Sequence, residues 1–437
     1  MDLVIDGRWI YYPLSGEVIN NGRIVIEEKK IIYSGPRGKE SDKKAGHEYY
    51  NFEKGLVIPG LINAHTHIPM TLQRGISENK SLQTWLQHIW SIEPNLLPED
   101  AYWGTMLGIA EMLAGGTIGF NDQYFYSDQI ARAIHETGIK AVLAPSIFFA
   151  GNPESNSMEE AFKHAKNVHD KWNGNNNRLY VAFGPHAPYT VGKEWFQTIA
   201  NEARDRGTNI HTHLNETEYE VNESQKTHSL RPIEWMDKIG VLETINSAAH
   251  CVHLSQAERD LLKKYRVNVL HCPKSNAKIG TGIADTPRLL KENINVCLAT
   301  DGQASNNKLD MFEEMSFEAL IHKAVYKDPT VVTSTEVVRM ATCNAQTLFP
   351  KNCYSGTLLE NTRADLTVLD LDSPGTTPVI DPVSHLCYAI GREQVVMTII
   401  DGSIVYQNGK FLTLDITKVK NEAQRVTNRL LETTSSD

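Results

Sequence analysis

Two histidines, His65 and His67, end an apolar run that begins at Val57 and contains Pro59-Gly60. In a β-strand, residues i and i+2 point to the same face, so both imidazoles would project side by side. Neutral imidazole is a common metal ligand, and two of them make half of a metal site. A His-x-His pair also occurs without a metal, so this interpretation needs further ligands elsewhere in the chain.

Histidines or acidic residues stand at the end of later apolar runs as well. The parallel strands of a barrel gather groups in this position at one rim, so their recurrence is hard to explain as accident. The candidates are His186, His211, His213, Glu216, His250, His253, His271 and Asp301.

These residue types fit a hydrolytic metal site. Three histidines and one carboxylate would hold a divalent metal, with zinc favoured, and leave one coordination position open for water. The metal lowers the pKa of that water to about 7, so that hydroxide is available at neutral pH. A carboxylate must accept the proton of the water, and a second acid must protonate the leaving group. Asp301 suits the first task, and Glu216, three residues after His213, suits the second.

These groups can meet only if several strands end at a common edge. The sequence from residue 58 to about 350 has a suitable pattern, because it alternates between apolar runs and helical stretches. The segments 101–114, 131–137, 193–206 and 255–265 have helical spacing. Eight β/α units predict an α/β protein with a (β/α)8 TIM-type barrel, and a doubly wound sheet is the alternative. The expected strands are the run before His65 and residues 117–120, 140–144, 179–183, 209–213, 248–252, 267–270 and 295–300.

Both ends of the chain read as β-structure with turns, which predicts a small β-sandwich domain built from the two ends. The expected domains are residues 1–57 for the N-terminal part of the β domain, 58–354 for the hydrolase barrel and 355–437 for the C-terminal part of the β domain. Residues 416–433 have the spacing of a terminal helix.

Composition narrows the possible partners and location. The net charge of -10 argues against nucleic acid or an anionic membrane surface as the main partner. No apolar run has the length of a transmembrane helix, and we find no signal-peptide pattern. The six cysteines form no Cys-x-x-Cys pair, which predicts reduced thiols and a cytoplasmic protein. The partner that the site residues predict is a small-molecule substrate.

Seven motifs spread along nearly the whole chain resemble those of the amidohydrolase superfamily, in its ATZ/TRZ branch. Within this branch the sequence is similar to the 5-methylthioadenosine/S-adenosylhomocysteine deaminases. The motifs are Pro59–Gly75, Gly184–Tyr189, His211–Thr217, Ala249–Leu254, His271–Ala284, Thr300–Asn307 and Asp381–Leu386.

The resemblance implies a metal-dependent deaminase that converts an adenine nucleoside to its inosine analogue and ammonia. It implies one divalent metal, zinc or alternatively Fe²⁺ or Mn²⁺, and a homo-oligomer. A dinuclear site would need a carboxylated lysine after the fourth strand, and Phe183–His186 contains none. The metal ligands implied by the resemblance are His65, His67, His213 and Asp301.

The resemblance also implies roles for residues outside the ligand set. His250 orients the attacking hydroxide, and Glu216 transfers a proton to the ring nitrogen. The residues expected at the bound nucleoside are Trp85, Glu93, His186, Glu216 and Ser305. Independently of the resemblance, residues 74–92 are a candidate lid.

One departure bears on the substrate. Members that act on S-adenosylhomocysteine look as though they hold its carboxylate with arginines after the third strand, but residues 144–161 contain no arginine. A neutral 5′-group, as in methylthioadenosine, 5′-deoxyadenosine or adenosine, therefore fits better, with Phe148 and Phe149 facing it. The alternatives are an aminohydrolase or chlorohydrolase acting on guanine, a pterin, cytosine or an s-triazine, and an inactive metal-binding scaffold.

Overall fold

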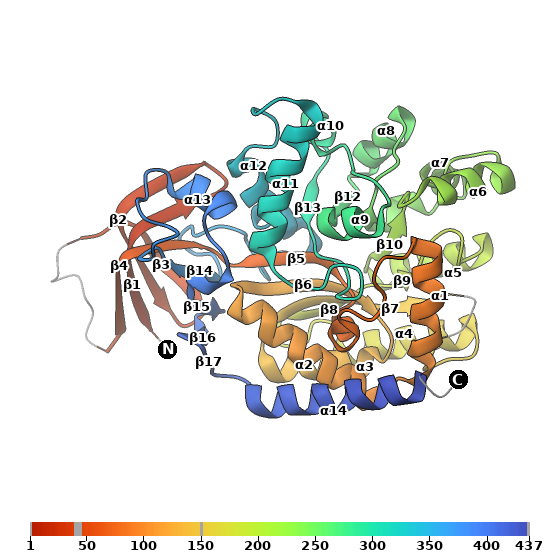
Figure 1. Cartoon of the computed structure of the whole chain (residues 1–437), viewed down its shortest axis with the longest axis horizontal. Helices are drawn as coiled ribbons and strands as arrows, with labels where there is room; N and C mark the ends of the chain where they lie inside the picture. Colours follow the sequence, from red (N-terminus) through yellow and green to blue (C-terminus); the bar gives the residue numbers. More distant parts are fainter. Residues whose placement is uncertain (1, 39–45, 149–151, 435–437) are drawn as a thin grey trace. The chain divides into compact units, whose positions relative to one another are not determined.

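A mixed eight-stranded sheet is built from both ends of the chain in the computed structural model, which describes residues 2–38, 46–148 and 152–434. β4 lies in its middle, parallel to β1 and antiparallel to β14. The strand order is β17-β16-β15-β14-β4-β1-β2-β3 (Figure 1). The strands are β1 (Leu3–Tyr12), β2 (Glu17–Glu27), β3 (Lys30–Pro36), β4 (Glu48–Pro59), β14 (Leu366–Asp370), β15 (Val395–Ile400), β16 (Ser403–Gln407) and β17 (Lys410–Phe411).

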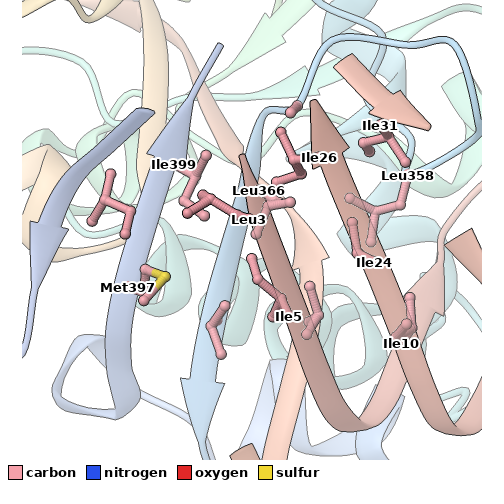
Figure 2. Packing of buried hydrophobic residues seen from close by; sticks show 14 of the residues in the cluster. Leu3, Ile5, Ile10, Ile24, Ile26, Ile31, Leu358, Leu366, Met397 and Ile399 are labelled. Atoms are coloured by element: carbon pink, nitrogen blue, oxygen red, sulfur yellow. The ribbon is translucent and has the colours of Figure 1, made fainter. Parts of the chain in front are cut away.

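Apolar side chains from both ends of the chain form one buried cluster on this sheet. Figure 2 shows Leu3 and Ile5 of β1 in the same cluster as Leu366 of β14 and Ile399 of β15. Since burying such side chains is the main favourable term in folding, neither end is expected to form its part of the sheet alone. The prediction that the two ends pair is therefore confirmed, whereas their arrangement as a sandwich stays a prediction.

A buried ion pair between Asp6 and Arg23 fixes β1 against β2. The Asp6 oxygens accept from the Arg23 guanidinium at 2.7 and 2.9 Å and from the Tyr49 hydroxyl at 2.5 Å. Burial alone would raise the pKa of Asp6, but these bonds and the charges of Arg23 and Arg37 hold it below 3.8. The folded protein therefore favours the charged carboxylate.

Replacing Asp6 with Asn is expected to destabilise the protein by about 3–5 kcal/mol, because the Arg23 charge stays buried without its partner. The contribution of Asp6 is fully present above its unfolded-state pKa and is lost as the pH falls through the lower folded-state value. Denaturant unfolding of both proteins from pH 7 to acid pH measures this, and the difference should shrink only at the acid end. Asp372→Asn is the control, since that carboxylate pairs with Lys54 at the surface. Equal effects of the two substitutions would contradict the prediction.

Two further sheets carry the strands expected from the alternating part of the sequence. One has the order β5-β6-β7-β8 with β9 beside β7, and the other has the order β10-β11-β12-β13, with its strands parallel (Figure 1). Each of the eight predicted runs overlaps a strand, and the two-residue β9 follows the run 179–183 as an additional strand. The strands are β5 (Leu61–Thr66), β6 (Thr117–Tyr124), β7 (Lys140–Ile147), β8 (Leu179–Val181), β9 (Gly184–Pro185), β10 (Ile210–Leu214), β11 (Ile245–His250), β12 (Asn268–His271) and β13 (Val296–Leu298).

Backbone hydrogen bonds link the two sheets at two places. The His211 amide donates to the Phe183 carbonyl at 3.0 Å, which joins β10 to the chain after β8. The Asp301 amide donates to the His65 carbonyl at 3.0 Å, which joins the chain after β13 to β5. The residues at the ends of β5, β8, β10 and β13 therefore lie along a common edge of the two sheets.

Helices follow most of these strands, as the sequence predicts. Their ends match the sequence chemistry: Ser255 and Glu258 form a capping box at the start of α8, and α3 stops at Gly138 with φ of 77°. The helices after the strands are α2 (Pro98–Ala114), α3 (Ser127–Thr137), α4 (Met158–Trp172), α5 (Lys193–Arg206), α6 (Glu218–His228), α7 (Pro232–Lys238), α8 (Gln256–Tyr265), α9 (Pro273–Ile279) and α10 (Thr286–Lys291).

The remaining helices include one that contains the candidate site residue Trp85 and one near the C-terminus. The C-terminal α14 (Ile416–Thr434) contacts the first turn of α2 and the residues just before it, because Arg429 bonds the Asp100 carboxylate and the Asn95 carbonyl. The predicted terminal helix is thus confirmed. The others are α1 (Leu82–Ile92), α11 (Met311–Tyr326), α12 (Ser334–Met340) and α13 (Pro382–Tyr388).

The chain divides into two compact units. The first comprises Met1–Asn63, Ala110–Gly119 and Leu309–Asp415, and the second comprises Ala64–Ile109, Phe120–Lys308 and Ile416–Asp437. The predicted boundaries at residues 57 and 354 stay predictions. Among the described residues no helix combines the length and the apolar character that crossing a membrane requires.

Candidate metal centre

Four histidines and one aspartate converge in the second unit. Potential ligand atoms of His65, His67 and His213 lie within 4.8 Å of one another, as do those of His65, His250 and Asp301. The Asp301 Oδ1 atom lies 3.4 Å from His65 Nε2 and 3.3 Å from His67 Nε2. The structure therefore brings together all four residues that the resemblance implies as ligands, and it places His250 beside them.

Hydrogen bonds on the far side of the rings orient the imidazoles. The Nδ1 atom of His67 lies 2.5 Å from the Gln123 carbonyl, and that of His213 lies 2.8 Å from the His186 carbonyl. A carbonyl can only accept, so each Nδ1 carries a hydrogen, and the neutral form of each ring has its lone pair on Nε2. Such bonds behind a ring are typical of metal-binding histidines.

His65 is held by a second histidine. Its Nδ1 atom lies 2.9 Å from His211 Nε2, and His211 Nδ1 lies 2.9 Å from the Ser247 hydroxyl. His65 Nε2 is buried without a hydrogen-bond partner among the described residues. An unsatisfied ring nitrogen that faces two other imidazoles and a carboxylate fits a bound divalent cation.

Two serine hydroxyls hold Asp301. Its Oδ2 atom lies 2.6 Å from Ser275 Oγ and 2.8 Å from Ser305 Oγ, and Asp301 itself has φ of 63°. Aspartate tolerates this left-handed conformation better than most residues. Because the serines occupy Oδ2, Oδ1 remains directed at the histidines.

The charges of these groups are strongly coupled. Burial opposes protonation of His67, but the hydrogen bond and charge of Asp301 raise the pKa of His67 to about 9. Burial would also raise the pKa of Asp301, but His65 and His67 hold it well below its usual range. Asp301 is thus an anion beside an imidazolium, a charge arrangement that a bound cation can replace.

Glu216 and His250 face the same space. The Glu216 Oε2 atom lies 3.9 Å from His250 Nε2. Burial, with the charge of Asp301, raises the pKa of Glu216 to about 8, although His67 acts in the opposite direction. Glu216 therefore holds a proton at neutral pH, as an acid for a leaving group must. His250 Nδ1 contacts the Asn276 amide nitrogen at 3.1 Å.

A cavity opens directly beside the cluster, and the remaining candidates line it. Trp85 donates from its indole to the Ala304 carbonyl at 3.3 Å, so its ring stays in the cavity wall. Glu93 accepts from the Tyr124 hydroxyl at 2.8 Å, and burial raises its pKa to about 7. The cavity is lined by His67, His213, Glu216, His250 and Asp301 together with Trp85, Glu93, His186 and Ser305.

The structure adds residues that sequence reasoning missed. Ser275 and Tyr124 orient Asp301 and Glu93, but each is separated from its partner by more than twenty residues, so no local pattern signals the contact. Other histidines stand apart: His253 Nε2 contacts the Thr281 carbonyl at 2.7 Å, and His228 stacks on Trp235. Phe148 lines the cavity, whereas Phe149 lies outside the described residues.

Comparison with known proteins assigns this arrangement to a family. The profile of the amidohydrolase family matches residues 56–405, which include every candidate site residue. The chain is 40% identical over 415 residues to a 5'-deoxyadenosine deaminase of Methanocaldococcus jannaschii, covering 94% of this chain and 97% of that protein. It is 35% identical to a 5-methylthioadenosine/S-adenosylhomocysteine deaminase of Dictyoglomus turgidum, covering 94% of this chain and 95% of that protein.

A solved structure agrees with the sequence comparisons. An adenosine deaminase from Xanthomonas campestris with bound zinc superimposes with a TM-score of 0.95 and 31% identity, covering 99% of both chains. The agreement extends over both compact units, so the likeness is not confined to the residues of the candidate site.

Proposed function

The chain belongs to the amidohydrolase family, and from this premise we propose that it is a metal-dependent hydrolase that removes the amine of an adenine nucleoside. The products are the inosine analogue and ammonia. The observation that carries the proposal is the convergence of His65, His67, His213 and Asp301 beside the buried acid Glu216. The similarity to nucleoside deaminases over most of the chain supports the nucleoside as substrate.

We assign one divalent cation, with zinc favoured, to His65, His67, His213 and Asp301. When bound, it acts as a Lewis acid and lowers the pKa of water to about 7. The donor set of three imidazoles and one carboxylate suits zinc, and Fe²⁺ or Mn²⁺ remain alternatives. One cation per chain is expected because the segment after β8 offers no lysine for a bridging group.

Three side chains act on the water and the substrate: two transfer protons, and one orients the attacking oxygen. Asp301 accepts the proton of the attacking water through Oδ1, the oxygen that the serines leave free. His250 orients the attacking oxygen, since its ring lies beside His65 and Asp301. Glu216 gives its proton to the ring nitrogen, and ammonia leaves once the amine has been protonated.

The rest of the cavity holds the nucleoside. Trp85 offers an aromatic face to the adenine ring. Glu93 can accept from ribose hydroxyls, and His186, whose Nδ1 contacts the Thr190 hydroxyl at 3.0 Å, presents its other nitrogen to the cavity. Ser305 completes the wall next to Asp301.

The 5′-substituent is proposed to be uncharged. A second cavity shares Trp90, Glu93, Phe125 and Phe148 with the first, and no cationic side chain lines it among the described residues. A substrate carboxylate in this cavity would have no arginine to bind it through two hydrogen bonds, and it would lie next to the carboxyl group of Glu93. Methylthioadenosine, 5′-deoxyadenosine and adenosine therefore fit better than S-adenosylhomocysteine.

The finer architecture is part of the proposal. The hydrogen bonds that join β10 to the Phe183 region and β5 to Asp301 support closure of the eight strands into a (β/α)8 barrel. A β-sandwich domain is also retained as part of the proposal, supported by the sheet that the two ends of the chain form together. A homo-oligomer and a cytoplasmic location are retained as predictions.

A substrate panel tests the proposal. The zinc-loaded protein is expected to release ammonia from methylthioadenosine, 5′-deoxyadenosine and adenosine, with kcat/KM for S-adenosylhomocysteine lower by roughly 100-fold. The methyl ester of S-adenosylhomocysteine distinguishes the effect of the carboxylate charge from the effect of size. It removes that charge without making the substituent smaller, so it should recover part of the lost kcat/KM. Turnover of guanine, a pterin or cytosine without turnover of any adenine nucleoside would contradict the nucleoside assignment.

A further inference from the structure

Glu220 makes an unusual contact behind the proposed acid. It is buried at 3% exposure in the first turn of α6. Its Oε1 atom accepts from the Asn215 amide at 3.0 Å, and its Oε2 atom accepts from the Glu216 amide at 2.8 Å. The two carboxylate oxygens thus accept from two consecutive backbone amides, those of the Leu214–Asn215 and Asn215–Glu216 peptides.

This contact differs from the ordinary capping box that the chain uses elsewhere. In a capping box the third helical residue reaches back to the amide of the N-cap residue itself. Glu258 does so with Ser255 at 2.9 Å, and Glu336 does so with Thr333 at 2.7 Å. The N-cap of α6 is Thr217, yet Glu220 reaches past it to the two preceding residues.

The side chain of Asn215 is also held in place by hydrogen bonds. Asn215 has φ of 53°, the left-handed conformation in which the chain turns from β10 towards α6. Its side-chain amide donates to the Glu258 carboxylate at 2.8 Å and to the His253 carbonyl at 3.0 Å. Glu258 is itself bonded to Arg231 at 2.6 Å. A continuous polar network therefore ends on the peptide that carries Glu216.

We infer that Glu220 is a positioning residue that fixes the backbone of Glu216 and thereby aims its carboxyl group into the cavity. The inference rests on the proposed function of Glu216 as the proton donor. Reaction rates depend steeply on the placement of such a group, since an error near 1 Å costs about 100-fold. The contact with both amides leaves the Glu216 peptide little freedom to rotate.

Glu220→Gln tests the inference with almost no change in shape. One oxygen becomes the NH2 of a carboxamide, which can only donate and would face a backbone N–H, so one of the two bonds must be lost. The expected result is a 10- to 100-fold lower kcat, with an unchanged KM for methylthioadenosine and an unchanged zinc content. Glu336→Gln is the matched control, because it weakens an ordinary capping box and should lower thermal stability without changing kcat.

Amide hydrogen exchange gives a readout that does not depend on turnover. Exchange at the Asn215 or the Glu216 amide, whichever loses its bond to the side chain, should become faster in Glu220→Gln, and both amides should stay unchanged in Glu336→Gln. Unchanged exchange, or a kcat equal to that of the control, would overturn the inference. If the wild-type protein deaminates no nucleoside, the proposed function fails instead, and exchange alone then decides whether Glu220 fixes this peptide.

Discussion

Glu216→Gln is expected to lower kcat for an adenine nucleoside by roughly 10²- to 10⁴-fold while the protein keeps its metal. Burial and the charge of Asp301 raise the pKa of Glu216 to about 8, so the side chain carries a proton at neutral pH. Glutamine has the same shape but no acidic proton to give to the ring nitrogen. Steady-state kinetics, together with metal analysis of the same samples, measures the effect.

Glu218→Gln is the matched control for this substitution. Glu218 stands two residues away at the exposed start of α6, so its loss changes the same charge without reaching the cavity. Its kcat should equal that of the wild type. A Glu216→Gln protein with wild-type kcat would show that another group donates the proton, and a protein without metal would assign Glu216 a structural role.

Asp301→Asn should abolish activity by a different route, through loss of the metal. Asparagine keeps the shape and the contacts with Ser275 and Ser305 but removes the anion that faces His65 and His67. Losing several kcal/mol of transition-state stabilisation corresponds to at least about 10³-fold in kcat. Zinc content after dialysis and kcat with added zinc measure the two effects separately.

Ser275→Ala should have a smaller effect on zinc binding than Asp301→Asn. The hydroxyl bonds the Asp301 oxygen that points away from the histidines, and also the Ser305 hydroxyl. Loss of the Ser275 hydroxyl leaves the Oδ1 atom that faces the histidines in place and should weaken zinc binding by about 10- to 100-fold. Activity should then return when zinc is added in excess. Full zinc occupancy and full activity in Asp301→Asn would contradict the assigned ligand set.

The positions of the histidines could be predicted because strand geometry is periodic. His65 and His67 share a face as residues i and i+2, and β5 ends at Thr66, between them. His213 lies at the same place in β10, and its distance from Glu216 is set by the turn that leads into α6. Motif spacing therefore contains most of the information about this cluster.

The contacts that hold these residues could not be predicted in the same way. Ser275 reaches Asp301 across 26 positions and Tyr124 reaches Glu93 across 31, so only the folded chain brings them together. The segment that α14 packs against could not be predicted either. An apolar stripe shows that a helix packs against another element, but it does not identify that element. Glu220 had a local signal, Thr217-x-x-Glu220, which on its own predicts an ordinary helix cap.

Strand lengths were the least predictable feature. The run 179–183 reads as one strand, but β8 stops at Val181, and Phe183 bonds instead to the backbone of Asn209 and His211, opposite Ile210. Such a change of partner depends on neighbouring strands and leaves no mark in the apolar pattern. It matters for function, because it brings the His186 carbonyl within reach of His213 Nδ1.

Titration of metal-free protein with zinc, followed by deamination of methylthioadenosine, tests the central claim most directly. If the four ligands hold one catalytic cation, activity is absent before zinc is added, rises in proportion to zinc and reaches its plateau at one equivalent per chain. Deamination by the metal-free protein, or a saturated zinc site that releases no ammonia, would contradict the claim.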